Sequence, residues 1–556
     1  MSWRAIIGWA GAFGWLLCGC SSNGEASFAA DGGRGAADAG QRQCFGANDC
    51  APGQFCNQFG FCVTEGASAD LGAGDDGGGG PPEVIVHVDP PATGKRYVYV
   101  AVPDQNTVIK IDSVGLNVRT IDVGDNPTPL RTVPGEDVAL VLNQASNTAT
   151  LLRSQDDGSD VAITLPAAAG LNQLTMSPDG RYALGWFDLA LSGGQLSPRQ
   201  TFQDVTLFAL AAGREQSVDL SVGFNPTQVK YAPDGSACYV INDEGVSVIS
   251  LVTTPQPQIV PTVPLRRNPL TELPPDDVVI TPDGKTALAR FAALAGVRAV
   301  DLGTRAITDV VLPGSPTDLE VSPNGTLAVA VLRAQNEVDF LPLPSALTDA
   351  TAIDHVSTGT YVAGQIVITA DGAAGLLYTN ATTQKVMIVA DLATHALTSY
   401  ALKKGVRTVA ASPNGKAALI IHNKVPGTPS PMDPIDVYLD KLQGYSLFQV
   451  SSGYAKLQPT DAEPGPFAFA PGGGTGYLLL SNPAASVRSV EALDLTSFVI
   501  TSIALGSPPV AVGVVPQTAQ VFVAQDHPLG RMTFVDETTF LTRTLTGFGL
   551  NGQIIQ

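Results

Sequence analysis

Two stretches decide the fold of this chain: Leu174–Trp186 reads LTMSPDGRYALGW, and Val229–Ile241 reads VKYAPDGSACYVI. Each consists of an apolar run, a four-residue turn and a second apolar run. In the turn, Pro presets φ at the first central position, Asp hydrogen-bonds to nearby backbone, and Gly accepts a positive φ. Both stretches therefore predict a tight β-hairpin.

The same turn recurs along the chain. Between Pro134 and Pro516 there are 382 residues and eight intervals, or about 48 residues per interval. A period of about 40–50 residues with four short strands per period is typical of β-propeller blades. The further copies are TPDG at Thr281–Gly284, SPNG at Ser322–Gly325, TADG at Thr369–Gly372 and SPNG at Ser412–Gly415, with weaker versions that begin at Val133, Ala470 and Val515.

We therefore predict an all-β fold in which residues 83–556 form a β-propeller of four-stranded blades. A single blade would expose two apolar faces, so the blades must stack against one another. Nine turns and an opening unit make ten repeats, whereas propellers typically have four to eight blades; seven to ten blades fit the sequence. Two segments could close the ring, Gly552–Ile555 and Val84–Val88, and the sequence does not choose between them.

The opening unit also carries a family resemblance. Tyr99–Val102 (YVAV) followed by Asn106–Asp112 (NTVIKID) resembles the YVTN-type repeat, and Tyr378–Asn380 with Lys385–Asp391 is a second copy. Proteins with this repeat are bacterial and archaeal surface propellers, akin in fold to lactonase-type and haem d1-type propellers. The resemblance covers roughly residues 83–556 and implies the fold, but it implies no single function.

The composition excludes several classes of protein. The 556 residues include 31 Lys and Arg against 51 Asp and Glu, a formal net charge of −20. Nucleic-acid binding without sequence preference needs a basic face, so we expect no nucleic-acid partner. Charged residues make up 15% of the chain, which is too few for the wet faces of a helical bundle.

Residues 1–19 have the features of a lipoprotein signal peptide. Arg4 precedes an apolar run of 13 residues, Ala5–Leu17, which is shorter than the roughly 20 residues that a membrane-spanning helix needs. Leu17-Cys18-Gly19-Cys20 resembles a lipobox and implies that Cys20 is lipidated and anchors the chain to a membrane. Ser21 then implies an outer-membrane lipoprotein of a Gram-negative bacterium that faces the periplasm or the cell surface. The alternative is ordinary cleavage with incidental cysteines.

A small cysteine module lies between two segments rich in Gly, Ala and Asp: a tether at 20–40 and a linker at 64–82. The module, 41–63, is too short to enclose a core, and an exported chain favours disulfides over the paired spacing of a zinc site. We predict two disulfides, with 44–56 and 50–62 as one of three possible pairings, and a role as a stapled spacer. Cys238 lies in a strand-like context and is predicted to be a buried, inert thiol. The module's cysteines are Cys44, Cys50, Cys56 and Cys62.

Two long loops point to a candidate binding face. Asp188–Gln203 and His422–Pro434 both join the second and third strands of a repeat, which places them on the rim opposite the PDG-type turns. Long loops on one face of a rigid ring usually mark its binding face, although tolerated insertions would look the same. The candidate residues are Trp186, Asp188, Arg199, His422, Asp433, His527 and Arg531.

Other residues on this rim have simpler explanations. Trp186 offers a platform for a sugar or another ligand, or packs in the core. The remaining polar residues are expected to cap loops, among them Asn106, Asn143, Asn242 and Asn336.

The sequence predicts no catalytic residue, cofactor or metal. Its five histidines, at 87, 355, 395, 422 and 527, are scattered singly, and no haem-attachment, nucleophile-elbow or phosphate-binding motif is present. We expect a binding or scaffold module for an envelope protein or polysaccharide. The alternative is a lactonase-like hydrolytic propeller whose charged side chains would converge in the central funnel.

Overall fold

The computed structural model describes residues 91–155, 158–192, 201–252 and 259–550, together with the strands β1 (Gln54–Cys56), β2 (Cys62–Thr64) and β43 (Ile554–Ile555). β1 and β2 pair antiparallel, with Cys56 opposite Cys62. The predicted signal peptide, the lipidation of Cys20, and Cys44 and Cys50 of the cysteine module lie outside the described residues. The anchor and the two disulfides stay predictions.

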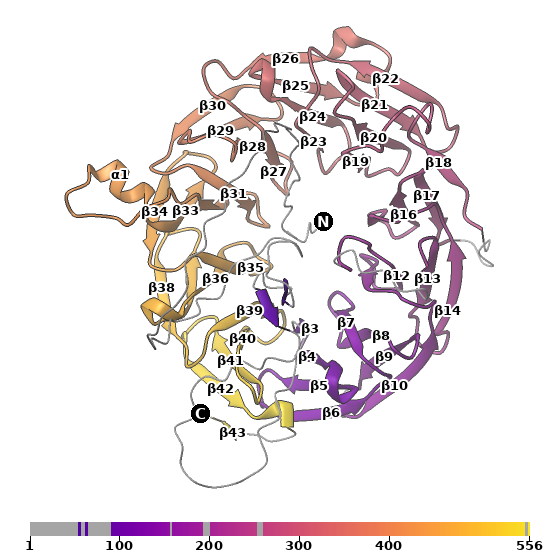
Figure 1. Ribbon diagram of the computed structural model, residues 1–556, viewed down its shortest axis with the longest axis vertical. Helices are drawn as coiled ribbons and strands as arrows, with labels where there is room; N and C mark the ends of the chain where they lie inside the picture. Colours follow the sequence, from indigo (N-terminus) through magenta and orange to yellow (C-terminus); the bar gives the residue numbers. More distant parts are fainter. Residues whose placement is uncertain are drawn as a thin grey trace, which may run out of the picture. The chain divides into compact units, whose positions relative to one another are not determined.

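The predicted propeller is confirmed, and it has ten blades. Each blade is an antiparallel sheet of four consecutive strands, and the last sheet carries β43 as a fifth strand. The sheets follow one another in chain order around a ring (Figure 1). The count therefore falls at the upper end of the predicted range.

The first five blades cover residues 92–311. Blade 1 contains β3 (Ala92–Thr93), β4 (Tyr97–Val102), β5 (Thr107–Asp112) and β6 (Val118–Asp122). Blade 2 contains β7 (Pro127–Thr132), β8 (Val138–Asn143), β9 (Thr148–Ser154) and β10 (Asp160–Pro166). Blade 3 contains β11 (Gln173–Met176), β12 (Tyr182–Trp186), β13 (Asp204–Ala209) and β14 (Gln216–Ser221). Blade 4 contains β15 (Gln228–Tyr231), β16 (Ala237–Asn242), β17 (Gly245–Ser250) and β18 (Thr262–Pro264). Blade 5 contains β19 (Asp277–Ile280), β20 (Thr286–Arg290), β21 (Gly296–Asp301) and β22 (Ile307–Val311).

The last five blades cover residues 318–546. Blade 6 contains β23 (Asp318–Val321), β24 (Leu327–Leu332), β25 (Glu337–Pro342) and β26 (Asp354–Ser357). Blade 7 contains β27 (Gln365–Ile368), β28 (Ala374–Tyr378), β29 (Val386–Asp391) and β30 (Leu397–Ala401). Blade 8 contains β31 (Val406–Ala411), β32 (Ala417–His422), β33 (Gln443–Gln449) and β34 (Ala455–Thr460). Blade 9 contains β35 (Pro464–Phe469), β36 (Thr475–Asn482), β37 (Val487–Asp494) and β38 (Ile500–Ala504). Blade 10 contains β39 (Pro509–Val515), β40 (Gln520–Gln525), β41 (Arg531–Asp536) and β42 (Thr542–Thr546).

Helices contribute little to the described residues. The one α-helix there is α1 (Ile435–Asp440), and no helix in these ranges is long and apolar enough to cross a membrane. The 3-10 turns are η2 (Pro103–Gln105), η3 (Arg333–Gln335), η4 (Ser345–Leu347), η5 (Ala350–Ala352), η6 (Pro483–Ala485) and η7 (Phe548–Leu550).

The PDG-type turns form as predicted, between the first and second strands of their blades. In the turn from β11 to β12, Gly180 has φ of +69°. The Ser177 hydroxyl and the Arg181 N–H both donate to Asp179 Oδ1, at 2.7 and 3.1 Å. The repeated Ser/Thr-x-Asp/Asn-Gly pattern is thus a self-capping turn.

The glycines of the six strong turns, from Gly180 to Gly415, also lie close to the preceding blade. A Cβ on Gly235 would lie 2.3 Å from Asp179 Oδ2, and one on Gly415 would lie 2.7 Å from the Asp371 carboxylate. Only glycine permits both the positive φ and this close approach. The turns therefore pack against one another from blade to blade.

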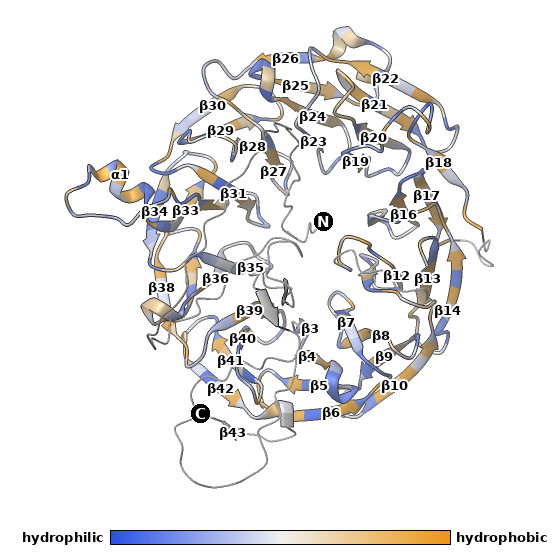
Figure 2. Cartoon of the chain, viewed as in Figure 1, coloured by the Kyte–Doolittle hydropathy of each residue, from blue (hydrophilic) through white to orange (hydrophobic). Residues whose placement is uncertain are grey.

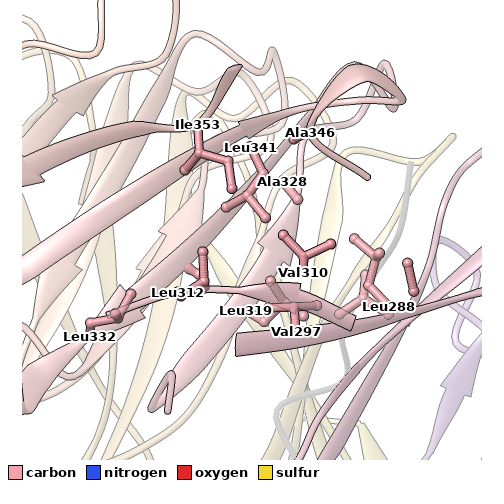
Figure 3. Packing of buried hydrophobic residues seen from close by; sticks show 13 residues of the cluster. Leu288, Val297, Val310, Leu312, Leu319, Ala328, Leu332, Leu341, Ala346 and Ile353 are labelled. Carbon is pink, nitrogen blue, oxygen red and sulfur yellow. The ribbon is translucent and has the colours of Figure 1, made fainter. Parts of the chain in front are cut away.

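Side chains between blades form the core. Between blades 5 and 6, Leu288 and Val297 pack with Leu319, Ala328 and Leu341 in one buried cluster (Figure 3). Figure 2 shows apolar and polar residues alternating along outer strands such as β6 and β14. Successive side chains of a strand point to opposite faces of the sheet, so the two faces of these strands differ in polarity. Cys238 is buried in the cluster between blades 3 and 4, as predicted, and burial raises the pKa of its thiol.

The sequence left two candidate segments for closing the ring. Of the first, Gly552–Ile555, residues Ile554–Ile555 pair with β42 at the outer edge of blade 10 and not with blade 1. The innermost strand of blade 1 is β3, which pairs with β4. The competing segment, Val84–Val88, lies outside the described residues.

The ring closes through side-chain packing between the first and last blades. Val100 and Ile109 of blade 1 share a buried cluster with Phe522 and Phe534 of blade 10. Two hydrogen bonds cross the same junction, from Gln517 N–H to the Lys95 carbonyl at 3.1 Å and from Gln105 Nε2 to the Gly549 carbonyl at 2.9 Å. Each described blade therefore consists of consecutive strands.

Candidate interaction face

The two rims of the propeller carry different sets of loops. We call the rim that carries the turns between first and second strands the turn rim, and the opposite rim the insertion rim. The insertion rim holds the loops between second and third strands and the connections between blades. Since strands alternate in direction, the two long loops lie on the insertion rim, as predicted; residues 193–200 of the first loop lie outside the described residues.

The second long loop forms an arm, residues 423–442, that projects outward from blade 8 (Figure 1). The Val425 N–H donates to the Asp440 carbonyl at 2.8 Å, which closes the arm at its base. Lys385 Nζ lies 2.7 Å from Asp440 Oδ2, and Lys441 Nζ lies 2.9 Å from Asp433 Oδ2. These contacts give the arm a defined shape.

Lys404 holds the arm on the ring. Its side chain is fully buried, and Nζ donates to the carbonyls of Leu439, Asp440 and Leu442 at 2.5, 3.1 and 2.9 Å. These carbonyls lie at and just beyond the C-terminal end of α1, where a cation is favourable. Burial lowers the pKa of Lys404 to about 8.

The outer surface of the arm is apolar. Met432 is 91% exposed, and Ile435, at the start of α1, is also largely exposed. Figure 2 colours much of α1 orange. Because internal contacts hold the arm, its apolar side chains face solvent in a fixed arrangement.

A second apolar area lies on the insertion rim of blades 3 to 5. Phe202 stacks on the half-exposed Phe224 with ring centroids 5.6 Å apart, and Phe187 contacts Phe202 edge-on at 5.5 Å. The loop 265–276, which joins blades 4 and 5, lies next to the Phe224 loop, since the backbone of Asp243 bonds to both.

Arg266 shapes that loop from inside. Its guanidinium donates to the carbonyls of Asp243, Pro269 and Glu272 at 2.6, 3.1 and 3.0 Å. The loop then carries Leu270, which is 92% exposed, and Leu273, which is also largely exposed. Leu270, Met432 and Leu273 are the three most exposed large apolar side chains among the described residues.

Two of the predicted face residues are in the core. Trp186 is 6% exposed and packs between blades 3 and 4, which fits the core alternative and not a ligand platform. His422 is 1% exposed; its Nε2 lies 2.6 Å from Ser446 Oγ and its Nδ1 lies 3.1 Å from the Gly405 carbonyl. Burial lowers the pKa of His422 to about 4, so it is neutral at pH 7.

The other predicted face residues are spread over the rim. Asp433 lies inside the arm, where the bond from Lys441 lowers its pKa. The Asp188 N–H donates to Asn172 Oδ1 at 2.7 Å, and the half-buried His527 accepts from the Leu529 N–H at 3.2 Å. Arg531 packs over Gly506, where a Cβ would lie 2.4 Å from Nη2. Arg199 lies outside the described residues.

The predicted loop caps are present. Asn106 and Asn336 end η2 and η3 in the left-handed conformation, with φ of 55° and 52°. Asn143 is buried and donates to Thr148 and Thr150, and Asn242 accepts from the N–H groups of Glu244 and Gly245. These side chains hold the loops of the rim in shape through hydrogen bonds and backbone conformation.

The innermost strands carry few charges. Two of the charged residues bond to the next blade: Lys230 Nζ donates to the Val278 carbonyl at 2.6 Å, and Asp318 accepts from the Ile366 N–H at 2.8 Å. Across the ten described innermost strands the charged residues are Arg131, Lys230, Asp277, Asp318, Glu320 and Arg407.

One group of three metal-type side chains comes together in the described part of the chain. Glu337, Asp339 and His355 offer ligand atoms that all lie within 4.8 Å of one another. They lie on β25 and β26, the two outer strands of blade 6, and not in the funnel. The sequence alone does not predict this cluster, because only the pairing of β25 with β26 places His355 next to the two acidic residues.

Comparisons with known proteins find only distant structural similarities. No family model matches the chain, and no curated protein matches it. A structure titled Kuenenia stuttgartiensis hydrazine synthase is 16% identical with a TM-score of 0.33, covering 57% of this chain and 96% of that one. A eukaryotic initiation factor is 12% identical with a TM-score of 0.46, covering 72% and 94%. The dihydro-heme d1 dehydrogenase NirN, in complex with DHE, is 16% identical with a TM-score of 0.35, covering 57% and 66%.

Proposed function

We propose that this chain is a lipid-anchored propeller of the bacterial cell envelope that binds a protein partner through its insertion rim. The observation that carries the proposal is the position of the three most exposed large apolar side chains, Leu270, Leu273 and Met432, all on that rim. They lie in two separate areas, the loop between blades 4 and 5 and the arm of blade 8. Exposed apolar areas are typical of interaction sites.

The chemistry of the rim favours a protein over a polysaccharide. Sugars are usually bound by exposed aromatic platforms, and Trp186 is buried. The exposed residues are instead Leu270, Leu273, Met432 and Ile435, and Phe224 lies beside the loop of the two leucines. Such side chains suit apolar pockets on a protein surface. The motif resemblance to YVTN-type surface propellers and the lipobox at Leu17–Cys20 support a place on the cell envelope.

The rim is tested by capture from envelope extracts with the mature chain as bait. A variant with Leu270→Ser, Leu273→Ser, Met432→Ser and Ile435→Ser should lose at least tenfold of its captured partner, because central apolar contacts dominate interface energies. A control variant, Tyr454→Ser with Val499→Ser, changes exposed apolar residues of the turn rim and should retain it. Equal capture by all three proteins would show that the insertion rim is not the binding face.

The anchor is tested separately. Cys20→Ala should move the protein from the membrane fraction to the soluble fraction and abolish its labelling by a radioactive or clickable fatty acid, since the acyl chains are the proposed anchor. Ser21→Ala, next to the proposed lipidation site, serves as the matched control. Membrane retention of Cys20→Ala with labelling intact would contradict the anchor.

A further inference from the structure

Strand pairing in blade 6 brings two carboxylates and an imidazole together. Glu337 and Asp339 are two residues apart on β25, so their side chains lie on the same face of the sheet. Asp339 lies directly opposite His355 of β26 in the register. Leu341 continues this face of β25 into the buried cluster between blades 5 and 6 (Figure 3).

The distances suit shared ligation. His355 Nδ1 lies 2.7 Å from Asp339 Oδ1 and 3.2 Å from Glu337 Oε1. Around a tetrahedral Zn²⁺ with bonds of about 2.0–2.2 Å, neighbouring ligand atoms are about 3.3–3.6 Å apart. Side-chain shifts of less than about 1 Å would therefore convert the two observed separations into that geometry.

One buried oxygen of the cluster lacks a hydrogen-bond partner. Asp339 is fully buried, at 0% exposure, and its Oδ2 is unpaired, while the buried Glu337 Oε1 has only the 3.2 Å contact to His355 Nδ1. Within the described residues no Lys or Arg forms an ion pair with either carboxylate. Buried polar atoms normally have partners, and an unmet one in a native structure points to an ion, a ligand or another role.

The cluster places two carboxyl groups together, one of them on a fully buried side chain. Two ionised carboxylates and a neutral imidazole carry a charge of −2, which is costly beside a buried group unless it is compensated. A divalent cation would neutralise that charge and bind the unpaired Asp339 oxygen.

We propose that Glu337, Asp339 and His355 form a binding site for one divalent transition-metal cation of the Zn²⁺ type. Imidazole nitrogen together with carboxylate oxygen is a donor set that Zn²⁺ accepts. His355 is partly exposed, so the site opens to solvent on its side, and a water completes the coordination. The bound ion links β25 to β26 and stabilises the outer edge of blade 6.

The test counts Zn²⁺ bound to the mature chain. The protein is stripped with a chelator, titrated with ZnCl₂ by calorimetry, and its metal content is measured by mass spectrometry after gel filtration. The wild type should bind one more Zn²⁺ than Asp339→Asn, and Zn²⁺ should raise the melting temperature of the wild type by several degrees but not that of the variant. His355→Gln, at a partly exposed position, should lose the same ion and guards against misfolding of the buried variant.

A neighbouring acidic residue provides the matched control. Asp354 precedes His355 on β26, is half-exposed, and pairs instead with His395 at 2.9 Å. Asp354→Asn should therefore bind as many Zn²⁺ ions as the wild type. Equal zinc content in the wild type, Asp339→Asn and His355→Gln would overturn the proposal, and the cluster would then be a hydrogen-bonded pair of carboxyl groups. A zinc loss in Asp354→Asn as large as in the other two variants would also overturn it.

Discussion

His422 is buried in the core, whereas the residues that follow it form the exposed arm. It is the last residue of β32, directly before the arm. The Gly405 carbonyl can only accept, so His422 Nδ1 carries the proton and Nε2 accepts from the Ser446 hydroxyl. Both nitrogens are thereby used, and protonation would break the bond to Ser446.

This arrangement predicts acid sensitivity. The pKa of His422 is about 4 in the fold, below the value of about 6.5 in an unfolded chain. The unfolded state therefore binds more protons between these values, and stability is lost as the pH falls from 6.5 toward 4. The expected loss from His422 is at most about 3 kcal/mol, from 1.36 kcal/mol per pKa unit.

Chemical denaturation between pH 4 and 8 measures this contribution. His422→Gln should be less stable than the wild type at pH 7, because it fits the two partners less well, and the gap should shrink toward pH 4. His527→Gln, which replaces a half-buried histidine on the same rim, should follow the wild-type curve. A constant gap between His422→Gln and the wild type would rule out His422 as the acid-sensitive group.

At the scale of the element, the arm depends on a contact from outside it. α1 has six residues and would not be stable alone, because short helices are marginal in water. Lys404, from the connection between β30 and β31, supplies three hydrogen bonds at its C-terminal end. The arm is thus a surface insertion with a buried attachment point.

Removal of that attachment should free the arm but leave the ring intact. Lys404→Met keeps the length of the side chain but removes three hydrogen bonds from a charged donor, each worth about 1.5–3 kcal/mol. The Leu439 and Asp440 carbonyls keep their bonds from the Leu442 and Val425 N–H groups. Limited proteolysis should then cut within residues 423–442 at least ten times faster than in the wild type, while the main melting transition changes little.

Lys403→Met is the control for this experiment, since Lys403 is the exposed neighbour of Lys404. It should be cut at the wild-type rate. Unchanged cleavage in Lys404→Met would mean that the ion pairs of Lys385 and Lys441 suffice to hold the arm.

At the scale of the whole molecule, the described residues close the ring by packing between blades 1 and 10, and none of their strands is exchanged between these two blades. The cluster between blades 1 and 10 includes Val98, Val100, Phe534 and Leu545, all buried. β43 adds only two residue pairs at the outer edge of blade 10, Leu545 with Ile555 and Thr546 with Ile554. The closing energy therefore comes from the blade faces.

Two changes separate these contributions. Phe534→Ala should lower the free energy of unfolding by about 3–5 kcal/mol, as expected for a large-to-small change in a core. Deletion of residues 551–556, which include β43, should cost less than about 1 kcal/mol, since it uncovers a short outer edge. Denaturant titration of both variants measures the difference, and a larger loss from the deletion would show that β43 closes the ring.

Much of the fold was predictable because it depends on local chemistry. The turns use Pro, Asp or Asn, and Gly within four residues, so the repeat, the order of strands and the rim of each loop follow from the sequence. Ten repeats could be counted in the sequence, but the number of blades stayed open between seven and ten. Ten exceeds the usual range for propellers, and ring closure depends on the whole chain.

The candidate sites were less predictable, because they depend on neighbours far apart in sequence. The long loops fall on one rim, as predicted, but Trp186 and His422 turn inward there. The burial of Lys404 under the arm depends on residues about 35 positions later.

The repeating four-stranded unit, the rim on which its insertions emerge and the lipobox-like pattern near the N-terminus can all be read from the amino-acid sequence. The ten-blade ring, its closure by packed faces among the described residues, the buried attachment of the arm, and the proximity of Glu337 and Asp339 to His355 become visible only in the folded chain. A turn forms within a few residues, whereas strand register and blade packing depend on burial between residues far apart in the chain.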